Sequence, residues 1–174
     1  MELLQGEAFD DLFRRFERTA FHLELQDSYH TPEEAGPFSL FLRGEPDDFA
    51  WHQPWLRQVR DATQAGKRLT RVRIASVPHG DYTRWGLNVA RLNIAAGEDI
   101  RWLPRHLTQA LDLTADDYWL FDDRWVVFTV FESGGRFAGG AQTVDPVIAE
   151  HCRRTRDQVW ARAVPTHEFA VRQS

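Results

Sequence analysis

The spacing of hydrophobic residues changes twice between residues 67 and 105. Residues 71–75 alternate polar and apolar side chains, which is typical of a half-buried strand. Between residues 82 and 96 the apolar side chains recur every three or four positions, which indicates a helix, and Gly97 is suited to end it. Residues 99–103 predict a second strand. A strand, a helix and a strand with short joints form a βαβ unit with parallel strands, and we expect this unit at the centre of the fold.

The chain before this unit predicts two helices and a pair of strands. Residues 7–18 place apolar side chains on one helical stripe, and residues 54–66 do the same behind a proline at the first helical position. Residues 21–25 and 37–43 alternate instead, with a polar, turn-rich link between them. The pattern therefore predicts an antiparallel pair of strands joined by a long exposed loop.

After the unit, residues 118–121 and 125–131 are rich in β-prone side chains and predict a hairpin or a long bulged strand. Residues 133–140 contain four glycines and are interpreted as a flexible connection. Asp145 and Pro146 are typical of a helix start, and the apolar stripe that follows predicts a last helix up to Trp160. Phe169 and Val171 could anchor part of the tail.

Composition limits the class of protein. With 174 residues, 43% of them hydrophobic, the chain 1–174 is expected to be a single α/β domain with a mixed sheet. The net charge of −5 argues against a nucleic-acid or membrane-surface binder. The single cysteine, Cys152, excludes an internal disulfide and a cysteine-rich zinc site. The sequence shows no signal peptide and no run of ~20 apolar residues, so a cytoplasmic location without membrane insertion is expected.

Motifs that carry known chemistry are missing from the sequence. It contains neither of the glycine-rich phosphate loops and no histidine pair with zinc-ligand spacing. Cys152 lies on the apolar stripe of the last predicted helix, where a nucleophile would face the core. His22 is predicted to face outward from a strand, and Arg71 and Arg73 are interpreted as part of a local basic face. No cofactor or metal is therefore expected.

Charged residues gather at the joints of the βαβ unit. If its strands end near Ala75 and Leu103, several of these side chains lie at the carboxyl ends of parallel strands, where open sheets bind ligands. Arginine offers a bidentate fork to carboxylates and phosphates. Structural ion pairs are the plainer interpretation of the same residues. The predicted ligand-binding or partner-binding residues are His79, Asp81, Arg84, Trp85, Arg101, Arg105, Asp122 and Asp123.

Three stretches, residues 81–85, 96–105 and 117–123, resemble an uncharacterised actinobacterial family of unknown function. Members of that family are often encoded beside helix-turn-helix regulators. The resemblance implies a regulatory setting and no established activity.

The predicted order of elements is also similar to one half of a phospholipase D-like domain. The catalytic mark of that superfamily is His-x-Lys-x-x-x-x-Asp, in which the histidine attacks phosphorus and the lysine holds the phosphate oxygens. With Asp123 at the motif aspartate, Asp116 takes the histidine position and Tyr118 the lysine position. The resemblance therefore implies a site without its nucleophile and its phosphate clamp.

The leading hypothesis is a non-catalytic regulatory domain that binds a protein partner, such as a helix-turn-helix regulator, or a small anionic effector around Arg84, Arg101 and Arg105. The first alternative is a metal-dependent hydrolase or nuclease with a site rebuilt from His79, Asp81, Asp122 and Asp123, because paired carboxylates near a histidine can hold a divalent cation. The second alternative is one member of a toxin–antitoxin pair. The sequence leaves self-association open.

Overall fold

The computed structural model describes residues 1–133 and 135–171. Gly134, in the predicted flexible connection, and residues 172–174 of the tail lie outside the described residues. In chain order the elements are β1 (Glu2–Leu4), α1 (Glu7–Asp10), α2 (Leu12–Arg15), β2 (Thr19–Glu24), α3 (Pro32–Leu42), the 3₁₀ turn η1 (Ala50–His52), α4 (Gln53–Gln64), β3 (Arg68–Ala75), α5 (Asp81–Ala96), β4 (Asp99–Pro104), the 3₁₀ turn η2 (Arg105–Leu107), β5 (Tyr118–Phe121), β6 (Trp125–Phe131), β7 (Phe137–Thr143), α6 (Pro146–Arg162), β8 (Val164–Pro165) and α7 (Thr166–Val171).

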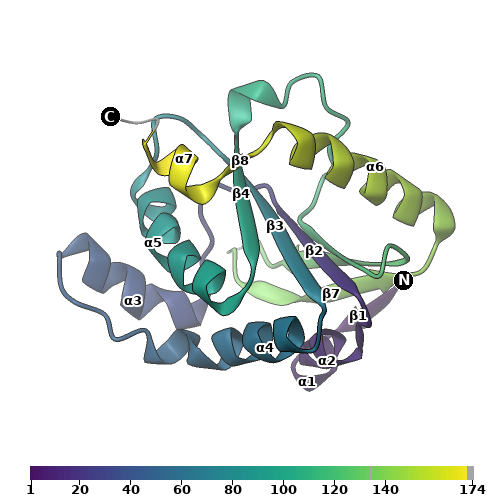
Figure 1. Ribbon diagram of the computed structural model, residues 1–174, viewed down its shortest axis with the longest axis horizontal. Helices are drawn as coiled ribbons and strands as arrows, with labels where there is room; N and C mark the ends of the chain where they lie inside the picture. Colours follow the sequence, from purple (N-terminus) through teal and green to yellow (C-terminus); the bar gives the residue numbers. More distant parts are fainter. Residues whose placement is uncertain (134, 172–174) are drawn as a thin grey trace.

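The strands form one open mixed sheet in the order β1-β7-β6-β5-β2-β3-β4-β8. β2, β3 and β4 are parallel, and all other neighbours are antiparallel. The α/β fold with a mixed sheet is therefore confirmed. Helix α6 covers one side of the sheet and α3, α4 and α5 cover the other (Figure 1). We call these sides the α6 face and the α5 face.

The predicted βαβ unit is confirmed as β3, α5 and β4. In the parallel register Arg71 lies opposite Ile100, and Val72 lies opposite Arg101. Gly97 has φ 115° and ends α5 as predicted. The helix begins one residue earlier than the sequence suggests, because Gly80, and not Asp81, is the N-cap residue.

The predicted antiparallel pairing of residues 21–25 with residues 37–43 is wrong. β2 pairs in parallel with β3, and residues 37–42 belong to helix α3. The rings of Phe38 and Phe41, three positions apart, stack at 6.5 Å, and Phe38 also contacts Tyr82 and Trp85 of α5. Packing of this segment against α5 therefore outweighs the alternation of its side chains, which occurs by chance in short segments.

Residues 7–18 form two one-turn helices instead of the single helix predicted. The chain becomes extended at Phe16. Directly after it, the backbone N–H groups of Glu17, Arg18 and Thr19 donate to the carboxylate of Asp122 at 2.8, 2.7 and 3.0 Å. These bonds hold the segment in the direction of β2.

The hairpin predicted over residues 118–131 is confirmed as β5 and β6. The predicted flexible connection is partly wrong, since residues 137–140 belong to strand β7. A Cβ atom on Gly139 would lie 2.5 Å from the carbonyl oxygen of Leu4, and one on Gly140 would lie 2.8 Å from the ring of Phe9. These glycines serve the close approach of β1 and α1 to β7.

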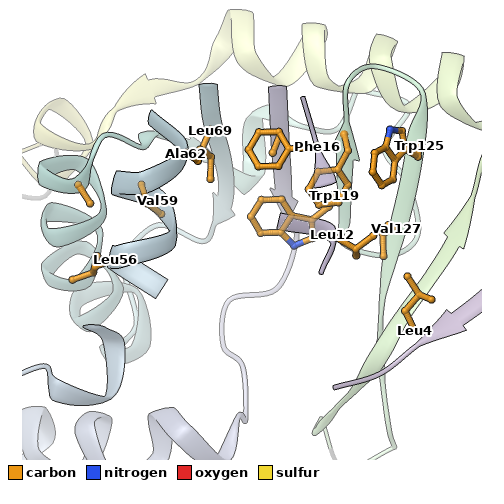
Figure 2. Packing of buried hydrophobic residues seen from close by; sticks show 13 residues of the cluster. Leu4, Leu12, Phe16, Leu56, Val59, Ala62, Leu69, Trp119, Trp125 and Val127 are labelled. Carbon is orange, nitrogen blue, oxygen red and sulfur yellow. The ribbon is translucent and has the colours of Figure 1, made fainter. Parts of the chain in front are cut away.

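Three clusters of buried side chains hold the layers together. The cluster shown in Figure 2 packs α2 and α4 on the α5 face, with Trp119 of β5 beside Phe16 and Leu12. On the α6 face, Cys152 and Val159 of α6 pack on the sheet, as the stripe of the last predicted helix indicated. The carboxylate of Asp145 accepts the N–H of Val147 at 2.8 Å and caps α6.

The tail of the chain is anchored through Phe169, which is buried against Trp102 in the third cluster. Val171 is exposed and does not contribute to the anchoring that the sequence suggested. Within the described part of the chain, none of the helices combines the length and the apolar character that crossing a membrane requires.

Candidate functional site

The eight predicted site residues do not share one cleft. His79, Asp81 and Arg84 follow the carboxyl end of β3, and Arg105 follows that of β4. Asp122 and Asp123 follow β5, which is antiparallel to β2, so they lie at the opposite end of the parallel strands, beside Thr19. The rebuilt hydrolase site with His79 and Asp81 therefore does not form. Consistently, the described residues contain no group of three or more potential metal ligands.

The residues predicted from the strand ends make local contacts. Arg84 pairs with Asp81 on the surface and donates to the carbonyl oxygen of His79 at 3.0 Å. The ring of His79 stacks on Phe169 at 4.4 Å. Arg105 contacts Asp27 and bonds to the carbonyl oxygen of Leu25 at 2.7 Å. These contacts fit the plainer interpretation, structural pairing.

The remaining predicted residues are divided between the two faces. The guanidinium group of Arg101 lies on the α6 face, 4.0 Å from the ring centre of Trp160. Asp123 pairs with Arg156 of α6. Trp85 lies on the α5 face, where it lines a pocket, and it is the one member of the predicted set that does so. Whether any of these residues binds a ligand or a partner stays a prediction.

The pocket on the α5 face has a volume of about 400 Å³, which is within the range of small-molecule sites. Its walls combine aromatic with charged and polar side chains, which come from α1, α2, α4, α5 and the central strands. The ring of Trp119 lies 4.8 Å from Phe13 and 5.9 Å from Trp55. We call this cavity the Trp119 pocket; its aromatic lining residues are Phe9, Phe13, Tyr29, Trp55, Tyr82, Trp85, Trp119, Phe131 and Phe137.

A buried ion network lies in the wall of the pocket that the sheet provides. The carboxylate of Glu24 accepts from Arg71 at 2.9 Å and lies 2.6 Å from Nε of Arg73. Arg71 also donates to Glu98 at 2.7 Å, and Glu98 accepts from Asn93 at 2.9 Å. Burial alone would raise the pKa of Glu24, but the guanidinium groups of Arg73 and Arg71 outweigh it and lower the pKa to about 2.

His22 lies beside this network with its ring stacked on Trp119, centre to centre 4.0 Å apart. The side chain is buried, with 8% of the residue exposed, and neither ring nitrogen has a hydrogen-bond partner in the described part of the structure. Burial lowers the pKa of His22 to about 3. The imidazole is therefore neutral at physiological pH, and its position 3.6 Å from Glu24 is not an ion pair.

Asp117 and Thr129 are two further polar residues of the pocket. The hydroxyl of Tyr29 donates to the carboxylate of Asp117 at 2.5 Å, and the N–H of Leu25 donates to its other oxygen at 2.8 Å. Burial raises the pKa of Asp117 to about 6, against the lowering effect of these two hydrogen bonds. The hydroxyl oxygen of Thr129 is buried and, among residues 1–133 and 135–171, has no hydrogen-bond partner.

The sequence pattern did not predict that polar side chains in the middle of the strands line a pocket. His22, Arg71 and Arg73 were predicted to face outward or to form a basic surface, yet all three line the Trp119 pocket. A usable signal was present: strands in a βαβ unit are covered on both faces, so charged side chains that alternate along such a strand must be buried.

The fold class can now be compared with known structures. The chain shares its fold with Nuc of Salmonella typhimurium, a phospholipase D family member, at 10% sequence identity and a TM-score of 0.51, over 88% of this chain and 84% of that one. It shares the same fold with NucT of Helicobacter pylori at 10% identity and a TM-score of 0.53, over 94% and 96% of the two chains. The predicted resemblance to a phospholipase D-like fold is confirmed.

The chain belongs to the family described as Domain of unknown function (DUF6879), whose profile matches residues 7–171. No curated protein has significant similarity to it.

None of the three positions that the resemblance assigned to the catalytic motif, Asp116, Tyr118 and Asp123, lines the pocket. Tyr118, at the lysine position, points to the α6 face, where its hydroxyl donates to the carbonyl oxygen of Cys152 at 2.7 Å. Asp116, at the histidine position, is exposed and does not line the Trp119 pocket.

Proposed function

We propose that this chain is a non-catalytic regulatory domain that binds a small effector in the Trp119 pocket. The observation that supports this function is a cavity of about 400 Å³, walled by aromatic rings, with the unpartnered imidazole of His22 in its wall. A buried polar group without a hydrogen bond costs free energy, and a ligand that supplies the bond recovers it. In the regulatory setting that the family resemblance implies, effector binding would alter the contact with a partner protein, such as a helix-turn-helix regulator.

The carboxylate that lies beside His22 is poorly suited to act as a general base. Glu24, the carboxylate nearest to His22, is shared between Arg71 and Arg73, which holds it ionised and occupied. A general base needs a pKa near the working pH and a free lone pair aimed at the substrate. Glu24 does not meet the first condition, because its pKa is about 2, and its Oε2 atom is engaged in the ion pair with Arg73.

The direct test is a thermal-shift and calorimetric screen of uncharged, cationic and anionic small molecules. Val89 of α5 lines the pocket and is half-buried, so Val89→Trp is expected to fill the cavity and abolish binding without removing a core side chain. Tyr118→Phe, on the α6 face, is the matched control and should leave binding unchanged. Binding that survives Val89→Trp would place the effector elsewhere and contradict the proposal.

A second candidate function is phosphodiester hydrolysis, which the shared fold with Nuc and NucT favours. In this chain His22 would be the nucleophile, because it is the histidine of the pocket that is neutral and unpartnered. Hydrolysis of bis(p-nitrophenyl) phosphate, measured with and without divalent cations and lost in His22→Phe, would replace the binding function by this one. The proposal of a binding domain expects no turnover above that of the variant.

A further inference from the structure

We infer that the effector of the Trp119 pocket is an uncharged, planar heteroaromatic ring that carries both a hydrogen-bond donor and a hydrogen-bond acceptor. The inference rests on the proposed function and adds the chemical class of the ligand. Purine and pyrimidine bases are simple representatives of this class.

The unpartnered polar atoms of the pocket define the hydrogen bonds that the ligand must make. A neutral imidazole offers one N–H donor and one acceptor nitrogen, and a threonine hydroxyl can do either. Both ring nitrogens of His22 and the hydroxyl oxygen of Thr129 lack a partner within the described residues, and both side chains line the same cavity. A ligand with only donors, or only acceptors, would leave part of this set unsatisfied.

The charges of the pocket argue against an ionic ligand. Its lining contains four carboxylates, on Asp10, Glu24, Glu34 and Asp117, against the two guanidinium groups of Arg71 and Arg73. Both of these arginines are paired with Glu24. An anion would meet the carboxylate excess without a free cation to oppose it, so the small anionic effector predicted from the sequence is the less favoured ligand.

A cation is also disfavoured at Glu24. This carboxylate is compensated by two arginines, and the guanidinium group of Arg73 already lies 5.9 Å from the ring centre of Tyr29 and 5.8 Å from that of Tyr82. The position that an aromatic cage would give to a ligand cation is therefore taken by a side chain of the protein.

The shape of the walls favours a flat ring. The rings of His22 and Trp119 stack on each other with their planes 11° apart, so a flat ligand would extend this stack on an outer face. Trp55 and Trp85 line the cavity from α4 and α5. Offset stacking on such rings contributes about 0.5–1.5 kcal/mol for each aromatic pair beyond the burial of area.

Five probes separate the properties of the ligand. Adenine and cytosine carry donors and acceptors on an uncharged ring, whereas indole carries a donor alone. Adenosine 5′-monophosphate adds a ribose and a phosphate to adenine, and benzoate is a simple aromatic anion. Dissociation constants are measured on the full chain by calorimetry and by tryptophan fluorescence. We expect adenine or cytosine to bind at least tenfold more tightly than indole, the nucleotide and benzoate.

Two nearly isosteric variants test the hydrogen bonds. Thr129→Val removes the hydroxyl, and His22→Phe removes the ring nitrogens while an aromatic ring still faces Trp119. Each is expected to weaken binding of the preferred base about tenfold, the value of one hydrogen bond, and to weaken binding of indole, which can make fewer of these bonds, by less. Thermal unfolding of both variants reports whether they are folded, and Thr129→Val, at the less buried residue, keeps the test valid if His22→Phe does not fold.

The outcomes distinguish this inference from the proposed function. Benzoate or the nucleotide binding more tightly than the bases, with loss of binding in Val89→Trp, would overturn the heteroaromatic ligand and leave the pocket as the effector site. Equal binding of indole and the bases, or no effect of Thr129→Val, would also overturn it. Failure of all five probes to bind would overturn the heteroaromatic ligand, whereas the proposed function is overturned when the wider screen of uncharged, cationic and anionic molecules finds no ligand that Val89→Trp abolishes.

Discussion

The imidazole of His22 lies parallel to the indole of Trp119, with 4.0 Å between ring centres and 11° between planes. The two residues sit on neighbouring antiparallel strands and face each other directly in the register of β2 and β5. The stack places a neutral, buried histidine in the wall of an aromatic pocket instead of in a hydrogen-bonded core. The account of function depends on this arrangement, and several measurements on stability test the structure around it.

The first prediction concerns pH. Burial lowers the pKa of His22 to about 3, whereas its ordinary pKa is about 6.5. Between these two pH values the unfolded chain therefore binds a proton at His22 and the folded chain does not. The free energy of unfolding should therefore fall as the pH is lowered from 6.5 towards 3, by up to about 1.4 kcal/mol per pH unit from this residue. Urea unfolding at several pH values should show a flatter curve for His22→Phe over that window.

The exposed histidine His106 provides the control for this experiment. His106→Gln should keep the pH dependence of the unaltered chain. Parallel curves for the unaltered chain and His22→Phe would show that His22 is not held neutral.

The second prediction concerns the ion network. Glu24→Gln removes the carboxylate that pairs with Arg73 and one of the two carboxylates that pair with Arg71, and both arginines stay buried. Loss of one partner of a buried ion pair typically costs about 3–5 kcal/mol, and a similar fall in the free energy of unfolding is expected here. Glu45→Gln, which breaks the exposed pair with Arg43, should change the free energy of unfolding much less, because solvent screens that pair. Equal effects of the two substitutions would be incompatible with a buried network.

The third prediction concerns the contribution of Asp122 to stability. The carboxylate of Asp122 accepts three backbone N–H groups, from Glu17, Arg18 and Thr19. Asp122→Asn should lower the free energy of unfolding by about 1.5–3 kcal/mol, the value of hydrogen bonds to a charged group. Asp123→Asn, at the neighbouring exposed position, should cost less than about 1 kcal/mol. Denaturant titration measures both, and a stable Asp122→Asn would mean that these bonds contribute little.

The fourth prediction concerns the end of α5. Gly97 has φ 115°, and a Cβ atom there would lie 2.7 Å from the hydroxyl of Thr63. Gly97→Ala should therefore lower the melting temperature more than Gly66→Ala, where φ is also positive at 81° but no atom lies within 4 Å of the added Cβ. Both substitutions carry backbone strain, which is larger at φ 115° because this angle lies farther from the left-handed region at a φ of about 57°, and the contact with Thr63 adds to the difference. Equal melting temperatures would argue against the close packing of α4 on the end of α5.

Local periodicity was sufficient to predict the centre of the fold. The βαβ unit and the helix after Pro146 carry long, regular patterns, so tertiary contacts reinforce what the sequence prefers locally. The prediction of a strand around Phe38 and Phe41 is wrong because the apolar side chains of this short segment fit the period of a strand as well as that of a helix. The contact of Phe38 with Tyr82 of α5 favours the helix. The strand at Gly139 and Gly140 was hidden because its glycines are required by neighbours that are remote in the sequence.

The candidate site was harder to predict than the fold. The sequence pattern indicated charged residues at strand ends, but none of the predicted charged residues lines the pocket, and Trp85 of α5 is the one predicted residue that does. The pocket instead uses side chains in the middle of strands, such as His22 and Arg71, whose burial depends on which helices cover that face. Because both neighbours of β3 are parallel to it, the arginines of β3 must lie beneath α5 or α6. No pattern in the sequence of β2 or β3 predicts, however, that these two strands are neighbours.

The central claim is that a small molecule occupies the Trp119 pocket. The most direct measurement is a series of ¹H–¹⁵N spectra of the tryptophan side-chain N–H groups during titration with adenine or cytosine. The signals of Trp55, Trp85 and Trp119 should shift with a common, saturable dependence on concentration, while that of Trp160, beneath Arg101 on the α6 face, stays in place. Movement of Trp160 alone, or no movement of the three pocket signals at saturating probe, would contradict the account.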